Sequence, residues 1–169
     1  MTSLLWPTAF VVVTALAAAT PAHAAPKQLL GKHLSLRGSV TIVGQPIEGG
    51  ESVTSKQSVE RTVYISSAGR IFVRMNSSNG SQTAVREQSP HNAPADDVSY
   101  RWQGDALVGT STAVRSTISF DPAFQTCAVS VVLKPNATAW DVNHKQWRIL
   151  SSTNTATCTI QDGNPFAGQ

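Results

Sequence analysis

The sequence predicts one all-β domain of about eight to ten short antiparallel strands, preceded by a signal peptide and closed by one disulfide. Apolar and polar residues alternate with a period of two through most of residues 33–161, and no segment shows helical periodicity. Turn residues separate the alternating runs at spacings of about 8–12 residues, which is typical of a β-sandwich or a closed barrel. Because successive runs are joined as hairpins, an up-and-down β-barrel is favoured over a sandwich.

Length and composition fit one domain that folds around a hydrophobic core. The chain has 169 residues, of which 41% are hydrophobic and 14% are charged, so it lacks the high charge of disordered segments. Its formal net charge of +3 is too small to indicate a dedicated nucleic-acid-binding protein. We therefore expect no nucleic-acid partner.

The N-terminal segment has the pattern of a secretory signal peptide. Residues 4–19 are apolar apart from two threonines and carry no charge, and they are followed by Pro21 and an Ala-His-Ala tripeptide that ends at Ala24. This pattern predicts cleavage after Ala24, whereas a membrane span needs about 20 apolar residues. We expect residues 1–24 to be removed. Residues 25–169 are then a single exported domain, periplasmic or secreted, that does not span a membrane.

The first half of the domain contains two clear strand patterns. Residues 34–42 place four apolar side chains on one face, with Gly38 at the centre as a position for a bulge or bend. Residues 59–65 and 71–75 alternate in the same way on either side of a short Ser-Ser-Ala-Gly turn, which predicts a β-hairpin. Residues 82–88 have a weaker strand pattern.

The second half continues the alternation to residue 161. The turn Gly104-Asp105 joins the expected strands 98–103 and 106–111, and the alternation places Trp102 on the core face. Four further strands are predicted, over residues 114–120, 127–133, 147–152 and 156–161.

Cys127 and Cys158 are the only cysteines of the chain. In an oxidising compartment, an even pair in a small domain is best interpreted as a disulfide, with two free thiols as the alternative. The bond would close a loop of about 31 residues and stabilise the domain by roughly 3–4 kcal/mol in the chain-entropy model.

Catalytic and metal-binding patterns are weak. The three histidines of the exported domain, His33, His91 and His144, lie far apart, and no Gly-x-Ser-x-Gly nucleophile motif occurs. Metal-ligand spacings and Gly-rich phosphate motifs are also absent. We therefore expect no catalytic residue, no metal site and no cofactor.

Six arginines fall on the polar phase of predicted strands. If adjacent strands align them, they form a face suited to carboxylate, phosphate or sulfate groups, such as those of anionic glycans or lipid head groups. The alternative is that surface arginines keep a small β-domain soluble. The six are Arg37, Arg70, Arg74, Arg101, Arg115 and Arg148.

Two tryptophans near the C-terminal end, Trp140 and Trp147, flank a polar segment and are candidates to cover the mouth of a barrel. Sugars and apolar ligands often bind against such rings. A ligand-binding interior would be lined by inward-facing residues, whereas a tightly filled interior would exclude this function. The residues expected to line such an interior are Val73, Trp102, Phe120 and Val131.

Residues 89–97 are the candidate loop for contact with a protein partner. Two prolines stiffen this segment, and its polar candidates are His91, Asn92 and Asp96.

Several segments carry resemblances to known proteins. Four features resemble small exported bacterial proteins without an established activity. They are the stretch Val-Tyr-Ile-Ser-Ser-Ala-Gly-Arg-Ile-Phe at residues 63–72, Ile-Ser-Phe-Asp at 118–121, Cys127 with its alternating strand, and Cys158 followed by Gly163-Asn164. This resemblance implies export and one disulfide-linked β-domain. The segment Tyr-Arg-Trp-Gln-Gly-Asp-Ala at residues 100–106 is similar to part of the periplasmic C-type lysozyme inhibitors, small disulfide-containing β-barrels, and implies a role of that class.

These observations favour a non-enzymatic exported β-barrel that binds a small apolar or glycan ligand or an anionic surface. The first alternative is a periplasmic or extracellular inhibitor or other protein-interaction module. A hydrolase is the second and least favoured alternative. The expected partner is accordingly a small ligand, a glycan or a protein.

Overall fold

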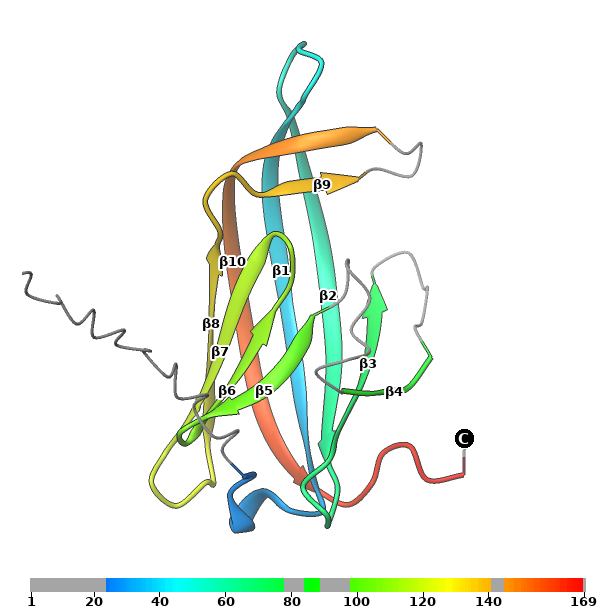
Figure 1. Ribbon diagram of the computed structural model, residues 1–169, viewed down its shortest axis with the longest axis vertical. Coiled ribbons are helices and arrows are strands. Elements are labelled where there is room, and N and C mark those ends of the chain that lie inside the picture. Colours follow the sequence, from blue (N-terminus) through cyan, green and yellow to red (C-terminus); the bar gives the residue numbers. More distant parts are fainter. Residues whose placement is uncertain (1–23, 78–83, 89–97, 141–144, 169) are drawn as a thin grey trace, which may run out of the picture.

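The structure is a computed structural model that describes residues 24–77, 84–88, 98–140 and 145–168. It is all-β: apart from the 3-10 turn η1 (Lys27–Leu29), the regular elements of the described residues are strands (Figure 1). The strands are β1 (Lys32–Pro46), β2 (Val53–Ile65), β3 (Ile71–Ser77), β4 (Arg86–Glu87), β5 (Ser99–Gln103), β6 (Ala106–Thr110), β7 (Val114–Phe120), β8 (Cys127–Leu133), β9 (Thr138–Trp140) and β10 (Gln146–Asp162).

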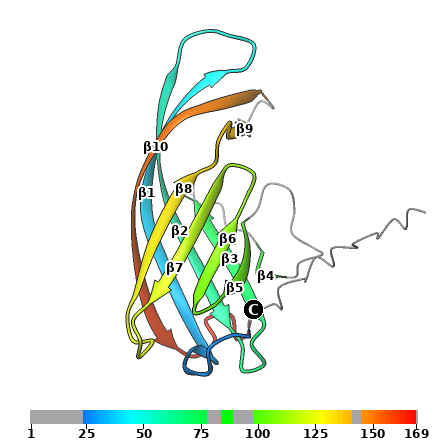
Figure 2. The same cartoon turned by 60° about the vertical axis from the view of Figure 1, so that its left-hand side comes forward.

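The strands form two antiparallel sheets that curl into a half-barrel (Figure 2). The first sheet has the order β4-β3-β2-β1-β10-β9, and the second has the sequential order β5-β6-β7-β8. The predicted all-β antiparallel class is confirmed. Within each sheet, strands that follow one another in the chain pair as neighbours, whereas the connections β4–β5 and β8–β9 pass from one sheet to the other. Strand β10 also returns to pair with β1 and so brings the C-terminal end of the domain beside its start.

Two seams separate the sheets. At one seam β8 lies beside β10, and the disulfide between Cys127 and Cys158 joins them with a Cα–Cα distance of 5.5 Å. The predicted disulfide is therefore confirmed. At the other seam the side-chain oxygen of Gln88 accepts a hydrogen bond of 3.1 Å from the backbone N–H of Tyr100.

Strands β1, β2 and β10 are longer than the alternation predicted and extend beyond the four-stranded sheet (Figure 1). The two separate strands expected at 147–152 and 156–161 are one strand, with a register shift opposite Val43 and Gly44. The intervening residues, Thr153, Asn154 and Thr155, have the composition of a turn, but here they pair with β1. The side chains of Ser39 and Thr155, for example, lie 3.0 Å apart and share a hydrogen bond across the ladder.

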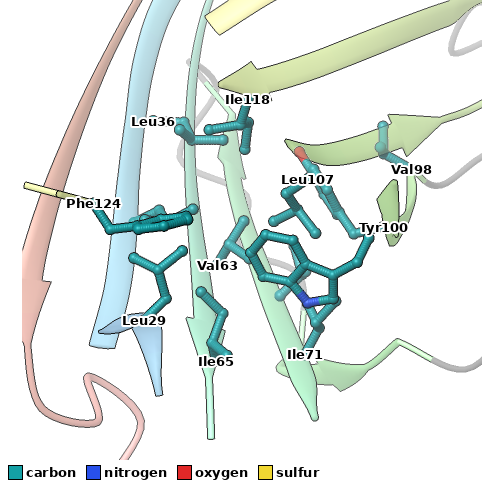
Figure 3. Close-up of a cluster of buried hydrophobic side chains, with 13 residues drawn as sticks. Leu29, Leu36, Val63, Ile65, Ile71, Val98, Tyr100, Leu107, Ile118 and Phe124 are labelled. Atoms are coloured by element: carbon teal, nitrogen blue, oxygen red, sulfur yellow. The ribbon is translucent and has the colours of Figure 1, made fainter. Parts of the chain in front are cut away.

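The hydrophobic core fills the half-barrel between the two sheets at the end nearest η1 (Figure 3). Leu34 and Val63 from the first sheet face Leu107 and Ile118 from the second, and all four are 0% exposed. Trp102 belongs to this core, as the alternation predicted, and is 7% exposed. The core thus occupies one end of the space between the sheets.

Candidate ligand-binding cavity

A cavity of about 240 Å³ lies between the sheets, adjoining the filled core at Leu36 and Tyr100. Both sheets contribute to its wall, because strands β1, β2 and β10 lie on one side and β5, β7 and β8 on the other. The lining is mostly apolar and consists of Leu36, Arg37, Gly38, Ser39, Val40, Ile42, Val59, Arg61, Val98, Tyr100, Val114, Ser116, Val129, Val131, Asn154, Thr155 and Ala156.

The expected lining of the interior was only partly correct. Val131 lines the cavity, but Val73 and Trp102 are buried in the core and Phe120 packs against that core. The alternation correctly predicted that these residues face the interior. It did not predict whether each of them lies in the filled core near η1 or beside the cavity. Aromatic and branched side chains fill the space at the lower level, so the cavity lies above them.

Residues with short side chains lie where the filled core adjoins the cavity. Gly38 pairs in register with Ala156, and Gly109 pairs with Ser116. Gly109 also allows close packing: a Cβ at this position would lie 2.5 Å from Ser116 Oγ and 2.8 Å from a ring carbon of Tyr100. The Tyr100 side chain therefore packs against β6 at a position where another side chain would displace it.

Arg61 is the charged residue that faces this interior. It lies between Val59 and Val63 on the inward phase of β2, opposite Leu36 in the ladder. Its Nη1 donates a hydrogen bond of 2.8 Å to the hydroxyl of Tyr100, and its Nη2 donates to the sulfur of Met75 at 3.2 Å. The guanidinium carbon also lies 5.7 Å from the centre of the Tyr100 ring, within the range of a cation–π contact.

The guanidinium of Arg61 has no carboxylate partner within the described part of the chain. Its Nε is buried and has no hydrogen-bond partner. Arginine stays protonated in proteins, so a half-buried positive charge faces a mostly apolar cavity, and its hydrogen-bond partners among the described residues, Tyr100 and Met75, are neutral. Such an arrangement costs free energy unless an anion or water compensates it.

A second cavity of about 240 Å³ lies further along the same face of the long strands. It shares Ile42 with the first cavity, and its wall includes Val53, Ile149 and the half-buried ring of Trp147. Trp147 was a sequence candidate for a ligand-contacting aromatic, and the structure places it in this second cavity. The other candidate, Trp140, ends β9, and its side chain lies outside the described part of the structure.

The six candidate arginines are distributed over both sheets. Four of them, including Arg148 on β10, lie on the six-stranded sheet or its turn. In this sheet Arg37 pairs with Glu60 at 2.9 Å and Arg70 with Glu87 at 3.3 Å. The guanidinium of Arg74 lies 5.3 Å from the centre of the Phe166 ring. Arg148 is exposed, as are Arg101 and Arg115 on the four-stranded sheet. An anion-binding role for these six stays a prediction.

The remaining sequence candidates are only partly described. His33 lies on the outer face of β1, where Nδ1 is 3.0 Å from the carbonyl oxygen of Gly163 and Nε2 is 2.9 Å from Oε1 of Gln161. These contacts attach the C-terminal segment to the first strand. The candidate partner residues His91, Asn92 and Asp96, like His144, lie outside the described residues.

No helix in the described ranges is long and apolar enough to cross a membrane. Within the same ranges, no group of three or more His, Cys, Asp or Glu residues is arranged to hold a metal ion.

Sequence reasoning missed Arg61, although the alternation contains the signal that identifies it. The apolar phase of residues 59–65 has an arginine where the pattern expects an aliphatic residue, whereas the six candidate arginines were all taken from the polar phase. A charged residue on the core phase of a strand is rare unless it has a partner or a function.

Comparisons with protein-family models, with curated proteins and with solved structures found no match to this chain.

Proposed function

We propose that this protein is an exported binding protein that holds a small apolar molecule in the cavity between its two sheets. The observation that carries the proposal is the change from a filled core to an open, mostly aliphatic cavity within one half-barrel. Protein interiors are packed as densely as organic crystals, and voids larger than a water molecule are few. A large apolar cavity with a few polar groups on its wall is characteristic of a ligand site.

The size of the cavity limits the ligand. An engineered apolar cavity of about 150 Å³ holds a molecule as large as benzene, and ordinary ligand pockets measure roughly 300–1,000 Å³. At about 240 Å³, the cavity beside Arg61 would enclose a short chain or one end of a longer molecule. The second cavity, which shares Ile42, gives a longer molecule a path along the same face toward Trp147.

Export is part of the proposal. The Cys127–Cys158 disulfide is compatible with an oxidising compartment, where such bonds persist. The N-terminal pattern that predicts a signal peptide supports the same destination.

Two neighbouring valines on β8 provide a matched test of the cavity. Val131 lines the cavity, whereas Val132 points outward and is 61% exposed. We expect Val131→Trp to fill part of the cavity and so to weaken binding of the neutral fluorescent probe N-phenyl-1-naphthylamine. The expected loss of affinity is about tenfold or more, and tenfold corresponds to about 1.4 kcal/mol of binding free energy. Val132→Trp should bind the probe as the wild type does.

The measurement is a fluorescence titration of the exported domain, with thermal unfolding to confirm that each variant is folded. Wild-type protein that does not bind this probe or any other neutral apolar probe would contradict the proposed function. Equal losses of probe affinity in Val131→Trp and Val132→Trp would indicate that the probe binds outside the cavity, and this result would also contradict the proposed function.

A further inference from the structure

We propose that the ligand is an amphiphile with a single carboxylate, whose chain occupies the cavity and whose carboxylate binds Arg61. This inference rests on the proposed function, and it adds the chemical class of the ligand.

Arg61 has unmet hydrogen-bonding capacity. Its guanidinium donates to one phenolic oxygen and to one thioether sulfur, and sulfur is a weak acceptor. Its Nε–H is buried without a partner. A carboxylate could accept two parallel N–H bonds from the planar guanidinium, and such charge-assisted pairs are stronger than bonds between neutral groups.

The described lining of the cavity has an excess of positive charge. Arg37 and Arg61 are the charged residues among those that line it. The guanidinium of Arg37 is already paired with Glu60, and its side chain is 72% exposed. Among the described residues of the wall, one positive charge therefore remains without a carboxylate partner, which matches a monoanion better than a doubly charged phosphate monoester.

Arg61 lies beside the apolar wall of the cavity. Val59, Val98 and Val114 line the same cavity as Arg61, and Tyr100 holds the guanidinium from the opposite sheet. An anion bound here would have its charge beside Arg61 and Tyr100 and its chain against the valines. A neutral apolar molecule would leave the positive charge uncompensated.

The test compares two ligands of equal chain length, decanoate and 1-decanol, as competitors of the neutral probe at neutral pH. For the wild type we expect decanoate to bind about tenfold more tightly than decanol, as a charge-assisted hydrogen bond implies. In Arg61→Met the preference should vanish, because decanoate binding falls while decanol binding changes little. Decyl phosphate should bind more weakly than decanoate to the wild type.

Two further variants make the result specific to Arg61. Arg101→Met removes the same charge from the exposed outer face and should keep the preference for decanoate. Arg61→Lys keeps the charge without the planar pair of donors and should keep only part of the preference. Because the first comparison uses wild-type protein alone, it remains decisive even if Arg61→Met does not fold.

The outcomes separate this inference from the proposed function. Equal binding of decanoate and decanol by the wild type would overturn the inference and leave the proposed function standing. A preference for decanoate that survives in Arg61→Met but is lost in Arg101→Met would also overturn the inference. It would indicate that the carboxylate binds to arginines on the outer face. Failure of the wild type to bind the probe and both ligands would overturn the proposed function itself.

Discussion

Arg61 donates a hydrogen bond of 2.8 Å to the hydroxyl of Tyr100 across the interior of the half-barrel. The bond joins β2 of the six-stranded sheet to β5 of the four-stranded sheet, at the level where the core ends and the cavity begins. A charged donor and a nearly buried phenol therefore connect the two walls of the cavity. This contact both positions the guanidinium and contributes to holding the sheets together.

Tyr100→Phe removes only the hydroxyl of this pair and leaves Arg61 Nη1 without its acceptor. We expect the free energy of unfolding to fall by about 1–3 kcal/mol, because a half-buried charged donor loses its partner. The measurement is urea unfolding of residues 25–169. Tyr64→Phe is the control, since Tyr64 lies on the outer phase of β2 and its ring packs against Phe72 and Phe166. Equal stabilities of the two variants would show that the Arg61–Tyr100 bond makes no net contribution.

The disulfide between Cys127 and Cys158 holds β8 to β10 at a seam where no ladder between these strands is described. Its loop spans 31 residues. We expect the double variant Cys127→Ser, Cys158→Ser to lose about 3–4 kcal/mol of unfolding free energy. It should also bind the apolar probe more weakly, because Val131 of β8 and Ala156 of β10 line the cavity from opposite sides of this seam.

Reduction of the wild type provides the control for the cysteine substitutions. A reducing agent should lower the stability of the wild type to that of the double variant and leave the double variant unchanged. Probe binding that is equally tight with and without the bond would show that the seam does not depend on the disulfide.

Gly109 and Gly44 offer a matched pair of glycine substitutions in strands. A methyl group at Gly109 would lie 2.5 Å from Ser116 Oγ, 2.6 Å from Val98 Cγ1 and 2.8 Å from Tyr100 Cε1, whereas at Gly44 the nearest atom, in the Trp147 ring, is 3.5 Å away. We expect Gly109→Ala to destabilise the domain by about 1–3 kcal/mol through overpacking. Gly44→Ala should leave the stability nearly unchanged, since 3.5 Å is an ordinary contact distance.

Urea unfolding of both glycine variants tests this prediction. Gly109→Ala should also weaken binding of the apolar probe, because Val98, Tyr100 and Ser116 all line the cavity. A Gly109→Ala protein as stable as Gly44→Ala would mean that the neighbouring side chains move aside at no cost.

The inward faces of individual strands could be predicted because alternation is a local property of the chain. The pattern placed Leu34, Val63, Trp102 and Ile118 on core faces, and all four are buried. The same local pattern does not reveal how far a strand extends when its partner supplies the hydrogen bonds. The Ser- and Thr-rich middle of β10 resembles a turn in sequence, but its pairing with β1 makes it a strand.

The cavity could not be predicted from alternation, because its position depends on which strands face each other across the interior. Val73 and Val131 have the same inward phase, yet one is in the core and the other lines the cavity. Whether such a residue lies in the core or beside the cavity depends on how strands that are distant in the sequence pack against each other. Arg61 was open to prediction, since a charge on the apolar phase of a strand is visible in the sequence alone.

Asp121 organises the turn between β7 and β8 through its side-chain oxygens. Oδ1 accepts hydrogen bonds from the backbone N–H groups of Thr126 at 2.6 Å and Gln125 at 2.7 Å, and Oδ2 accepts one from Ala123 at 3.3 Å. Within this turn Phe124 has a φ of 55° and is 8% exposed, so the turn places an aromatic ring in the core. The bond from the Thr126 N–H is the largest of the effects that hold the pKa of Asp121 below its ordinary value of 3.8.

Because the folded protein binds the Asp121 proton less tightly than the unfolded chain does, the charge on Asp121 stabilises the fold above pH 3.8, and this contribution is lost as the pH falls through the lowered pKa. We expect Asp121→Asn to have a lower melting temperature than the wild type at neutral pH, and the difference to shrink in acid. Thermal unfolding as a function of pH measures it. Asp105→Asn, in the exposed turn between β5 and β6, controls for the loss of one negative charge. A difference between wild type and Asp121→Asn that stays constant down to acid pH would show that the amide fails for steric reasons rather than for lack of charge.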